Sequence, residues 1–129
     1  MSKLANAVTS LMDATGWESS PPDEAGRIRF ALAEMEFFLQ APDDRHLSLL
    51  YPLATVDPGE DANARARGLA RMAAAAARSR SALLSLHEGT FYLHTMVDLA
   101  QTDVEKIPLL CQNFLNDCDW WRQNRPPAY

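Results

Sequence analysis

Three histidines, two cysteines and several adjacent carboxylates are the residues of this chain whose side chains could do chemistry. His46, His87 and His94 are the only histidines. His87 and His94 fall on one face of a predicted hairpin, but about four ladder positions, roughly 13 Å, apart. That separation is too long for a shared metal ion, so we expect solvated or half-buried sheet histidines rather than a metal site.

The two cysteines, Cys111 and Cys118, lie seven residues apart in a predicted helix. Their Cα atoms would be about 10 Å apart, which is too far for a disulfide, so we interpret them as small core residues. The sequence has no Cys-x-x-Cys, His-Glu-x-x-His, Gly-x-Gly-x-x-Gly or Gly-x-Ser-x-Gly motif. We therefore expect no metal, no cofactor and no enzyme activity.

The adjacent carboxylates lie in predicted loops and helix ends, where turn formation and capping account for them: Asp23-Glu24, Asp43-Asp44, Glu60-Asp61 and Asp117/Asp119. Arginines between Arg65 and Arg80 alternate with alanines and predict a solvated helix face. The formal net charge of -5 argues against general binding of nucleic acids, which depends on phosphate neutralisation.

The composition is that of an ordinary globular protein, with 47% hydrophobic and 22% charged residues. We expect one domain, residues 1–129. No apolar run approaches the roughly 20 residues that a membrane span needs. Residues 1–4 lack the apolar core of a signal peptide, so the prediction is a cytoplasmic protein.

A strand, a tight turn and a second strand are predicted over residues 81–99. Glu88-Gly89 is a two-residue connection between apolar runs, and glycine supplies the positive φ that such turns need. The resulting pairs are His87 with Thr90, Leu86 with Phe91, and Leu84 with Leu93. Alternation then places the last two pairs on the core face.

Two further turns organise residues 27–53. A turn at Ala33-Glu34 pairs Ile28 with Leu39 and Phe30 with Phe37 on one face. A second turn over residues 41–45 would place Gln40 opposite His46. Residues 30–40 are also rich in helix formers, so the sequence leaves a helix there as an open alternative.

Three helices complete the prediction. The first spans residues 3–15, with Gly16 as its stop. The second starts at a capping box, Asp57-Pro58-Gly59-Glu60, and runs to about Arg78 with an alanine-rich face that needs a flat partner surface. The third follows a capping box at residues 102–105, and Pro108 moves its start to about Ile107.

The fold class is therefore α+β, an antiparallel sheet with helices packed on it, in the order α-β-β-β-α-β-β-α. Apolar side chains also fall on the sheet face opposite the core, which suggests a partner surface: Phe38, Leu50, Tyr92 and Met96. The alternative is that the first or third helix covers them, or that the predicted register differs.

This pattern resembles the class I type III secretion chaperones, the CesT-like (Tir chaperone) family of small acidic proteins. The matching pieces are the helix at residues 4–16, the strands at residues 26–39, Leu47-Ser48-Leu49-Leu50-Tyr51-Pro52-Leu53, the hairpin at residues 83–99 and the final helix ending Asp119-Trp120-Trp121-Arg122. The middle helix departs from the family in being longer and richer in alanine and arginine.

The resemblance implies a non-enzymatic homodimer in the bacterial cytoplasm. Such a protein holds the N-terminal segment of a secreted effector in an extended, soluble form and presents it to the export ATPase. The implied effector-binding residues are Phe38, Leu50, Tyr92, Met96 and Leu11. The implied dimer interface comprises Leu69, Met72, Ala73, Ala76 and Leu83.

Three other functions remain open at this point. The first is a regulatory protein of the same fold that sequesters a secretion regulator or a transcription activator. The second is a small α+β enzyme, which would need a convergent pocket of titratable groups. The third is a nucleic-acid-binding module, which would bind oligonucleotides in a salt-dependent way.

Overall fold

Three helices and five strands follow one another in the predicted order. The computed structural model describes residues 3–32, 35–55, 61–76 and 83–124. A short 3-10 helix, η1, precedes the last helix. The elements are α1 (Lys3–Thr15), β1 (Ile28–Ala31), β2 (Glu36–Gln40), β3 (His46–Thr55), α2 (Ala62–Ala76), β4 (Leu83–His87), β5 (Thr90–Asp98), η1 (Val104–Lys106) and α3 (Ile107–Asn124).

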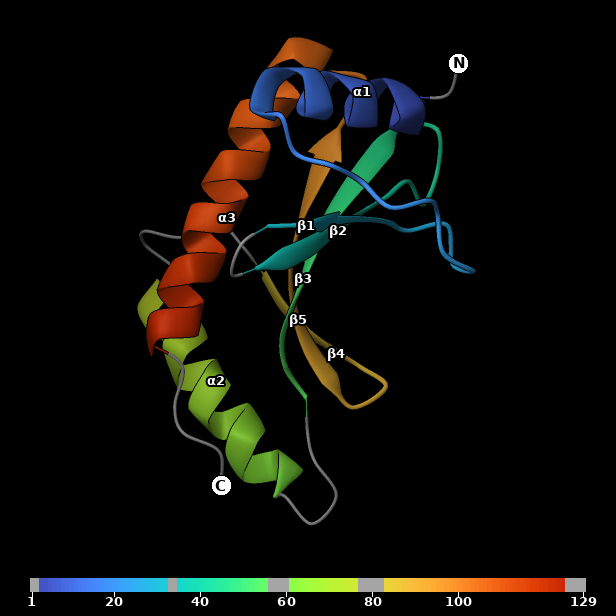
Figure 1. The fold of residues 1–129 in the computed structure, drawn as a ribbon. Coiled ribbons are helices and arrows are strands. Elements are labelled where there is room, and N and C mark those ends of the chain that lie inside the picture. Colours follow the sequence, from blue (N-terminus) through green and yellow to red (C-terminus); the bar gives the residue numbers. More distant parts are fainter. Residues whose placement is uncertain (1–2, 33–34, 56–60, 77–82, 125–129) are drawn as a thin grey trace.

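The five strands form one antiparallel sheet in the order β1-β2-β3-β5-β4. Figure 1 shows β1 and β2 crossing the upper part of the long β3–β5 pair and β4 at its lower end, so the sheet is strongly twisted. The α+β fold class is confirmed.

The helices lie on one side of this sheet, with α1 across its upper end and α3 along its length (Figure 1). Alternate strand residues point toward them and are buried, so that Phe30 stacks on Phe37 with ring centroids 5.3 Å apart. From the helices, the buried set comprises Ala7 and Leu11 of α1, Leu69 of α2, and Ile107, Cys111, Phe114, Leu115, Cys118 and Trp121 of α3. One helical layer and one sheet face therefore make the core.

Both predicted hairpins form with the expected pairing. Leu86 pairs with Phe91 and Leu84 with Leu93. Glu88 and Gly89 have φ angles of 48° and 79°, the two positive values of a type I′ turn. In the second hairpin, Ile28 pairs with Leu39 and Phe30 with Phe37. The alternative of a helix over residues 30–40 is therefore wrong. The predicted turn at residues 33–34 lies outside the described residues.

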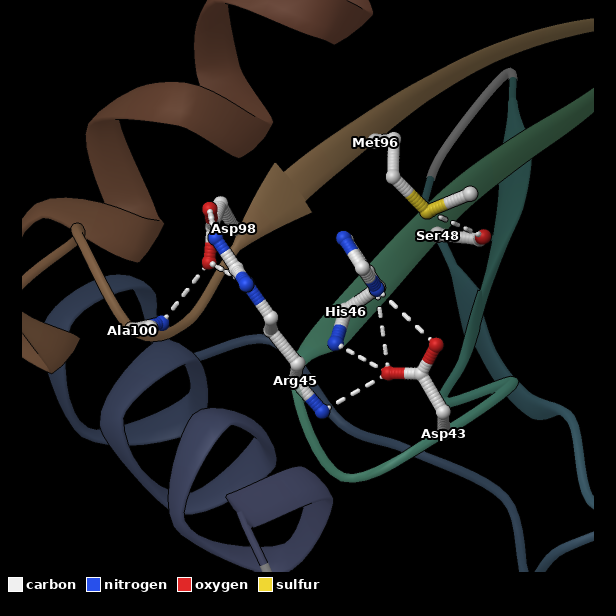
Figure 2. A network of polar contacts seen from close by, with 7 residues as sticks. All are labelled: Asp43, Arg45, His46, Ser48, Met96, Asp98 and Ala100. Carbon is white, nitrogen blue, oxygen red and sulfur yellow. Dashed lines mark hydrogen bonds and ion pairs between the residues drawn. The ribbon is translucent and has the colours of Figure 1, made fainter.

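The predicted β2–β3 register is wrong by two residues, because Gln40 pairs with Ser48 rather than with His46. The Asp43 carboxylate accepts backbone N–H bonds from Arg45 at 2.7 Å and His46 at 2.8 Å (Figure 2). This turn leaves His46 to pair with Asp98 of β5. A shift of two residues preserves the face of every side chain, so the inward set is unchanged.

Capping boxes were predicted at the starts of the second and third helices, and the structure shows which groups precede α2 and η1. Asp61 caps α2, since its carboxylate accepts N–H bonds from Asn63 at 3.0 Å and Ala64 at 3.2 Å. The capping box predicted at residues 57–60 lies outside the described residues. Asp103 precedes η1 without a side-chain cap, so the second predicted capping box is wrong. The start of α3 at Ile107 is confirmed.

Arg45, in the turn before β3, forms an ion pair with Asp98 at the end of β5, 2.8 Å from Nη2 to Oδ2 (Figure 2). The pKa of Asp98 is lowered to about 2, chiefly by the hydrogen bond from Arg45. A lowered folded-state pKa contributes stability above the unfolded value, and that stability is lost as the pH falls through the folded value.

We expect Asp98→Asn to lower the urea midpoint at neutral pH. Because the stability of the charged form is lost on acidification, the difference from the unmutated protein should shrink between about pH 4 and about pH 2. Urea titrations followed by circular dichroism would measure this. Asp44→Asn, in the exposed part of the same turn, is the control. Equal midpoints for the two variants at neutral pH would contradict the role of the ion pair.

Candidate protein-binding surfaces

The sheet face opposite the helices carries a cluster of apolar side chains. We call Phe38, Leu50, Tyr92 and Met96 the open-face patch. Phe38 of β2 pairs directly with Leu50 of β3, and Leu50 pairs with His94 of β5. Tyr92 and Met96 flank His94 on the same strand, four residues or about 13 Å apart. All four residues predicted from the alternation therefore share one face.

The open-face patch is accessible. Phe38, Leu50 and Tyr92 are half-buried, and Met96 is 55% exposed. Ser48, paired with Met96, donates its hydroxyl to the Met96 sulfur at 3.1 Å. The alternative that the first or third helix covers these residues is wrong, because α1 and α3 pack on the other face.

Arg27 lies over one side of the open-face patch. Its guanidinium carbon is 5.1 Å from the centre of the Phe38 ring, a cation–π contact. Its Nε is 3.0 Å from Asp23 Oδ2. Burial lowers the pKa of Arg27, but hydrogen bonds with Tyr92 and Asp23 outweigh it and leave the pKa raised. The guanidinium therefore stays charged above an aromatic ring.

A hollow of about 480 Å³ extends from Arg27 toward the β4–β5 hairpin. Its lining mixes the patch residues Leu50 and Tyr92 and the small Ala25 with polar side chains: Arg27, Gln40, Ser85, His87 and Glu88. This open hollow can accept side chains from a protein segment crossing the sheet.

A second groove, of about 450 Å³, lies between α1 and the segment that precedes β1. Leu4 and Val8 form its α1 wall, Ile28 lies on its β1 side, and residues 19–22 form the opposite wall. Leu11, the α1 residue implied by the family resemblance, is fully buried and does not reach this surface. Leu4 and Val8 precede Leu11 on the same face of α1 and are only half-buried, so they, rather than Leu11, line the groove.

The segment from Ser19 to Asp23 runs along the outer edge of β1. Ser20 N–H donates to the Arg29 carbonyl at 2.9 Å, and Asp23 N–H donates to the Arg27 carbonyl at 3.0 Å. Hydrogen bonds from the Arg27 backbone, with a further contribution from its side chain, lower the pKa of Asp23 and hold the carboxylate charged. The β1 edge is thus partly occupied by the chain itself.

Strand β4 is exposed on both faces. Leu83, on the open face, is 62% exposed, and Leu86, on the face that we expected to be buried, is 55% exposed. Among the described residues, β4 pairs with β5 alone, so its outer edge has no strand partner there. Apolar side chains on both faces of an unpaired edge are typical of a strand that another chain covers.

The residues that the resemblance places at a dimer interface are divided between the core and the surface. Leu69 is fully buried within the protomer and does not reach the surface, whereas Leu83 is exposed. Met72, Ala73 and Ala76 belong to α2, but their side chains lie outside the described set.

The prediction of a wholly solvated arginine face on α2 is wrong at one position. Arg65 is 6% exposed, because it precedes Leu69 by one helical turn and shares its buried stripe, while Arg67 and Arg71 are exposed.

The residues first considered for chemistry are dispersed or buried. Within residues 3–32, 35–55, 61–76 and 83–124, no three His, Cys, Asp or Glu side chains form a group suited to a metal ion. Burial raises the pKa of Cys111 to about 12 and also raises that of Cys118, so both thiols stay protonated. In the same part of the chain, no helix has the length and hydropathy to cross a membrane.

Comparison with known proteins identifies one family and several related folds. The model of the Tir chaperone protein (CesT) family matches residues 6–122. No curated protein sequence matches the chain.

Three solved structures share the fold. The ExsC–ExsE complex contains a chain that aligns with a TM-score of 0.70 and 20% identity, covering 100% of both chains. In the HopA1–SchA chaperone–effector complex the values are 0.61 and 14%, covering 95% of this chain and 99% of that one. The Yersinia pestis type III secretion chaperone SycH, solved with a fragment of YscM2, gives 0.62 and 9%, covering 92% and 98%.

Replacing a phenylalanine of β2 by alanine should lower the free energy of unfolding much more on the buried face than on the open face. Phe37→Ala removes a fully buried ring and should cost about 3–5 kcal/mol of unfolding free energy. Phe38→Ala removes a half-buried ring under Arg27 and should cost roughly 1 kcal/mol. Urea unfolding of both variants measures the difference. Similar losses at the two positions would mean that the open face is covered.

Proposed function

The chain belongs to the Tir chaperone protein (CesT) family, and on that basis we propose that it is a type III secretion chaperone that binds the N-terminal segment of a secreted effector. Its family is one of chaperones, not of enzymes. Binding would keep the effector segment extended, soluble and competent for export.

The open-face patch is the observation that carries this proposal. It presents four apolar side chains on a sheet face without a helical layer, at spacings set by the strands. An extended segment repeats its side-chain direction every two residues, about 7 Å. A segment of five residues with alternating apolar side chains would therefore reach from Tyr92 to Met96.

Strand addition supplies the second part of the proposed contact. An effector segment paired with the outer edge of β1 would place its side chains beside the groove lined by Leu4, Val8 and Ile28. It would have to displace Ser19–Asp23 from that edge, exchanging the Ser20–Arg29 hydrogen bond for its own. Pro21 and Pro22 have no N–H to donate, so the resident segment is a weak competitor.

The proposed dimer forms through β4 and α2. Leu83 and Leu86 project from opposite faces of the outermost strand, so a partner there must cover both faces. A second copy offers the same apolar strand and the alanine-rich α2, with Met72, Ala73 and Ala76 as proposed contacts. Leu69 contributes indirectly by anchoring α2 to its own protomer.

The remaining steps follow from this role. In the bacterial cytoplasm, the dimer would hold the effector until it presents the complex to the export ATPase. A regulatory protein of the same fold would use the same surfaces on a different partner. The identity of the captured protein therefore decides between the two functions.

Charges placed in the open-face patch should abolish effector capture. We expect Phe38→Glu/Leu50→Glu to retain less than about a tenth of the partner that the unmutated chain captures on co-expression with genes beside its own, because buried carboxylates lose their hydration. Affinity purification with quantified band intensities measures the ratio.

The matched control adds two carboxylates to the helix-covered side, as Gln112→Glu/Asn116→Glu at exposed positions of α3. It should capture the partner normally. Equal capture by Phe38→Glu/Leu50→Glu would rule out the open face as the binding surface. Failure of the unmutated chain to capture any secreted protein would instead count against the chaperone function itself.

Two double substitutions, one on each surface, separate the proposed dimer surface from the proposed effector surface. Light scattering of the unmutated chain should give twice the 14.4 kDa chain mass. Leu83→Glu/Leu86→Glu should weaken self-association by about a hundredfold or more, because two exposed apolar anchors become charged. Phe38→Glu/Leu50→Glu should remain dimeric. A Leu83→Glu/Leu86→Glu dimer of undiminished affinity would place the interface elsewhere.

A further inference from the structure

A groove runs along the other flank of α1, where this helix meets η1 and the start of α3. One hollow of about 630 Å³ lies between Asn6, Thr9 and Asp13 of α1 and Val104, Glu105 and Pro108. A second, of about 260 Å³, shares Asn6 and Val104 with the first and continues to Leu99 and Ile107. We call the two together the α1–η1 groove.

The walls of the α1–η1 groove are tied together. The Ser10 hydroxyl donates to the Val104 carbonyl at 3.1 Å, so a hydrogen bond between two residues that line the larger hollow connects α1 to η1. A groove held open by folded elements on both sides needs little rearrangement to accept a ligand.

Apolar side chains are exposed at this groove. Val104, which lines both hollows, is 42% exposed, and the half-buried Pro108 lines the larger one. Neither residue lines the hollow beside the open-face patch or the groove of Leu4, Val8 and Ile28. The proposed effector surfaces therefore do not account for the exposure of Val104.

The charges around these apolar residues are mostly negative. Asp13, Asp103 and Glu105 are exposed, and none of these carboxylates is in an ion pair with a basic residue of the described chain. Lys106 of η1 is the adjacent basic residue. An apolar groove with a net negative rim is complementary to a ligand that combines apolar and basic groups.

We propose that the α1–η1 groove docks a short basic amphipathic helix of a partner protein. Its apolar side chains contact Val104 and Pro108, and its lysines or arginines face Asp13 and Glu105. Leu4 and Val8 of α1 line one groove and Asn6 and Asp13 the other, with Thr9 common to both, so the two proposed ligands would bind on adjacent flanks of this helix. The proposal does not depend on the proposed effector site.

The test uses the full-length protein and a fluorescent peptide of about 14 residues, with leucines at helical spacing and lysines elsewhere. We expect saturable binding in fluorescence anisotropy. Amide chemical shifts should change at Thr9, Asp13, Val104 and Glu105. Asp13→Lys/Glu105→Lys should weaken binding at least about tenfold, and Val104→Ser at least about threefold.

Two controls make the outcome decisive. Glu18→Lys/Glu24→Lys makes the same change in net charge at exposed positions between α1 and β1 that do not line the groove, and should bind as the unmutated protein does. A peptide with glutamate in place of lysine should bind at least about tenfold more weakly. Equal weakening in both double variants would reduce the interaction to net charge and overturn the proposal. Shift changes confined to the open-face patch would also overturn it.

Discussion

The packing of one helical layer against one face of the sheet is the constraint on which the rest of this structure depends. Phe30 and Phe37 from β1 and β2 stack beneath it, and α3 contributes a long buried stripe that ends at Trp121. Each fully buried side chain of this size stabilises the fold by roughly 2–3 kcal/mol. In the part of the chain that the structure describes, no equivalent layer covers the other face, and the apolar side chains there are half-buried or exposed.

The same constraint explains the exposure of β4. The strand pairs with β5 in the register that places Leu84 and Leu86 on the core face, but the helical layer does not cover Leu86. At Leu86, β4 is therefore held in the sheet by its pairing with β5 and not by burial of its side chain. An apolar edge strand of this kind is an aggregation hazard in isolation. The proposed symmetric partner, which would cover both faces of β4, would remove that hazard.

Alternation and turn chemistry were sufficient to predict most of the fold and the open-face patch. They failed where a contact distant in sequence decides the outcome. The β2–β3 register depends on how Asp43 closes its turn and on Arg45 reaching Asp98, 53 residues away. Leu4, Val8 and Leu11 share one face of α1, so only the packing of the rest of the fold distinguishes the buried Leu11 from the half-buried Leu4 and Val8. The burial of Arg65 was missed because the arginines of α2 were all assigned to its solvated face, although Arg65 lies one turn before the buried Leu69.

The exposed apolar groups and strand edges, together with the burial of both thiols, determine the kind of ligand that these surfaces suit. Within the described residues, apolar groups and strand edges dominate, and the chemically reactive thiols are buried and protonated. Strand edges recognise any extended backbone, and a row of shallow apolar sites recognises side-chain spacing rather than a folded shape. A folded protein has already satisfied its backbone groups and buried its alternating apolar residues, so it has little to exchange. The geometry therefore selects segments that are unfolded when they bind, which is the state a secretion substrate must keep.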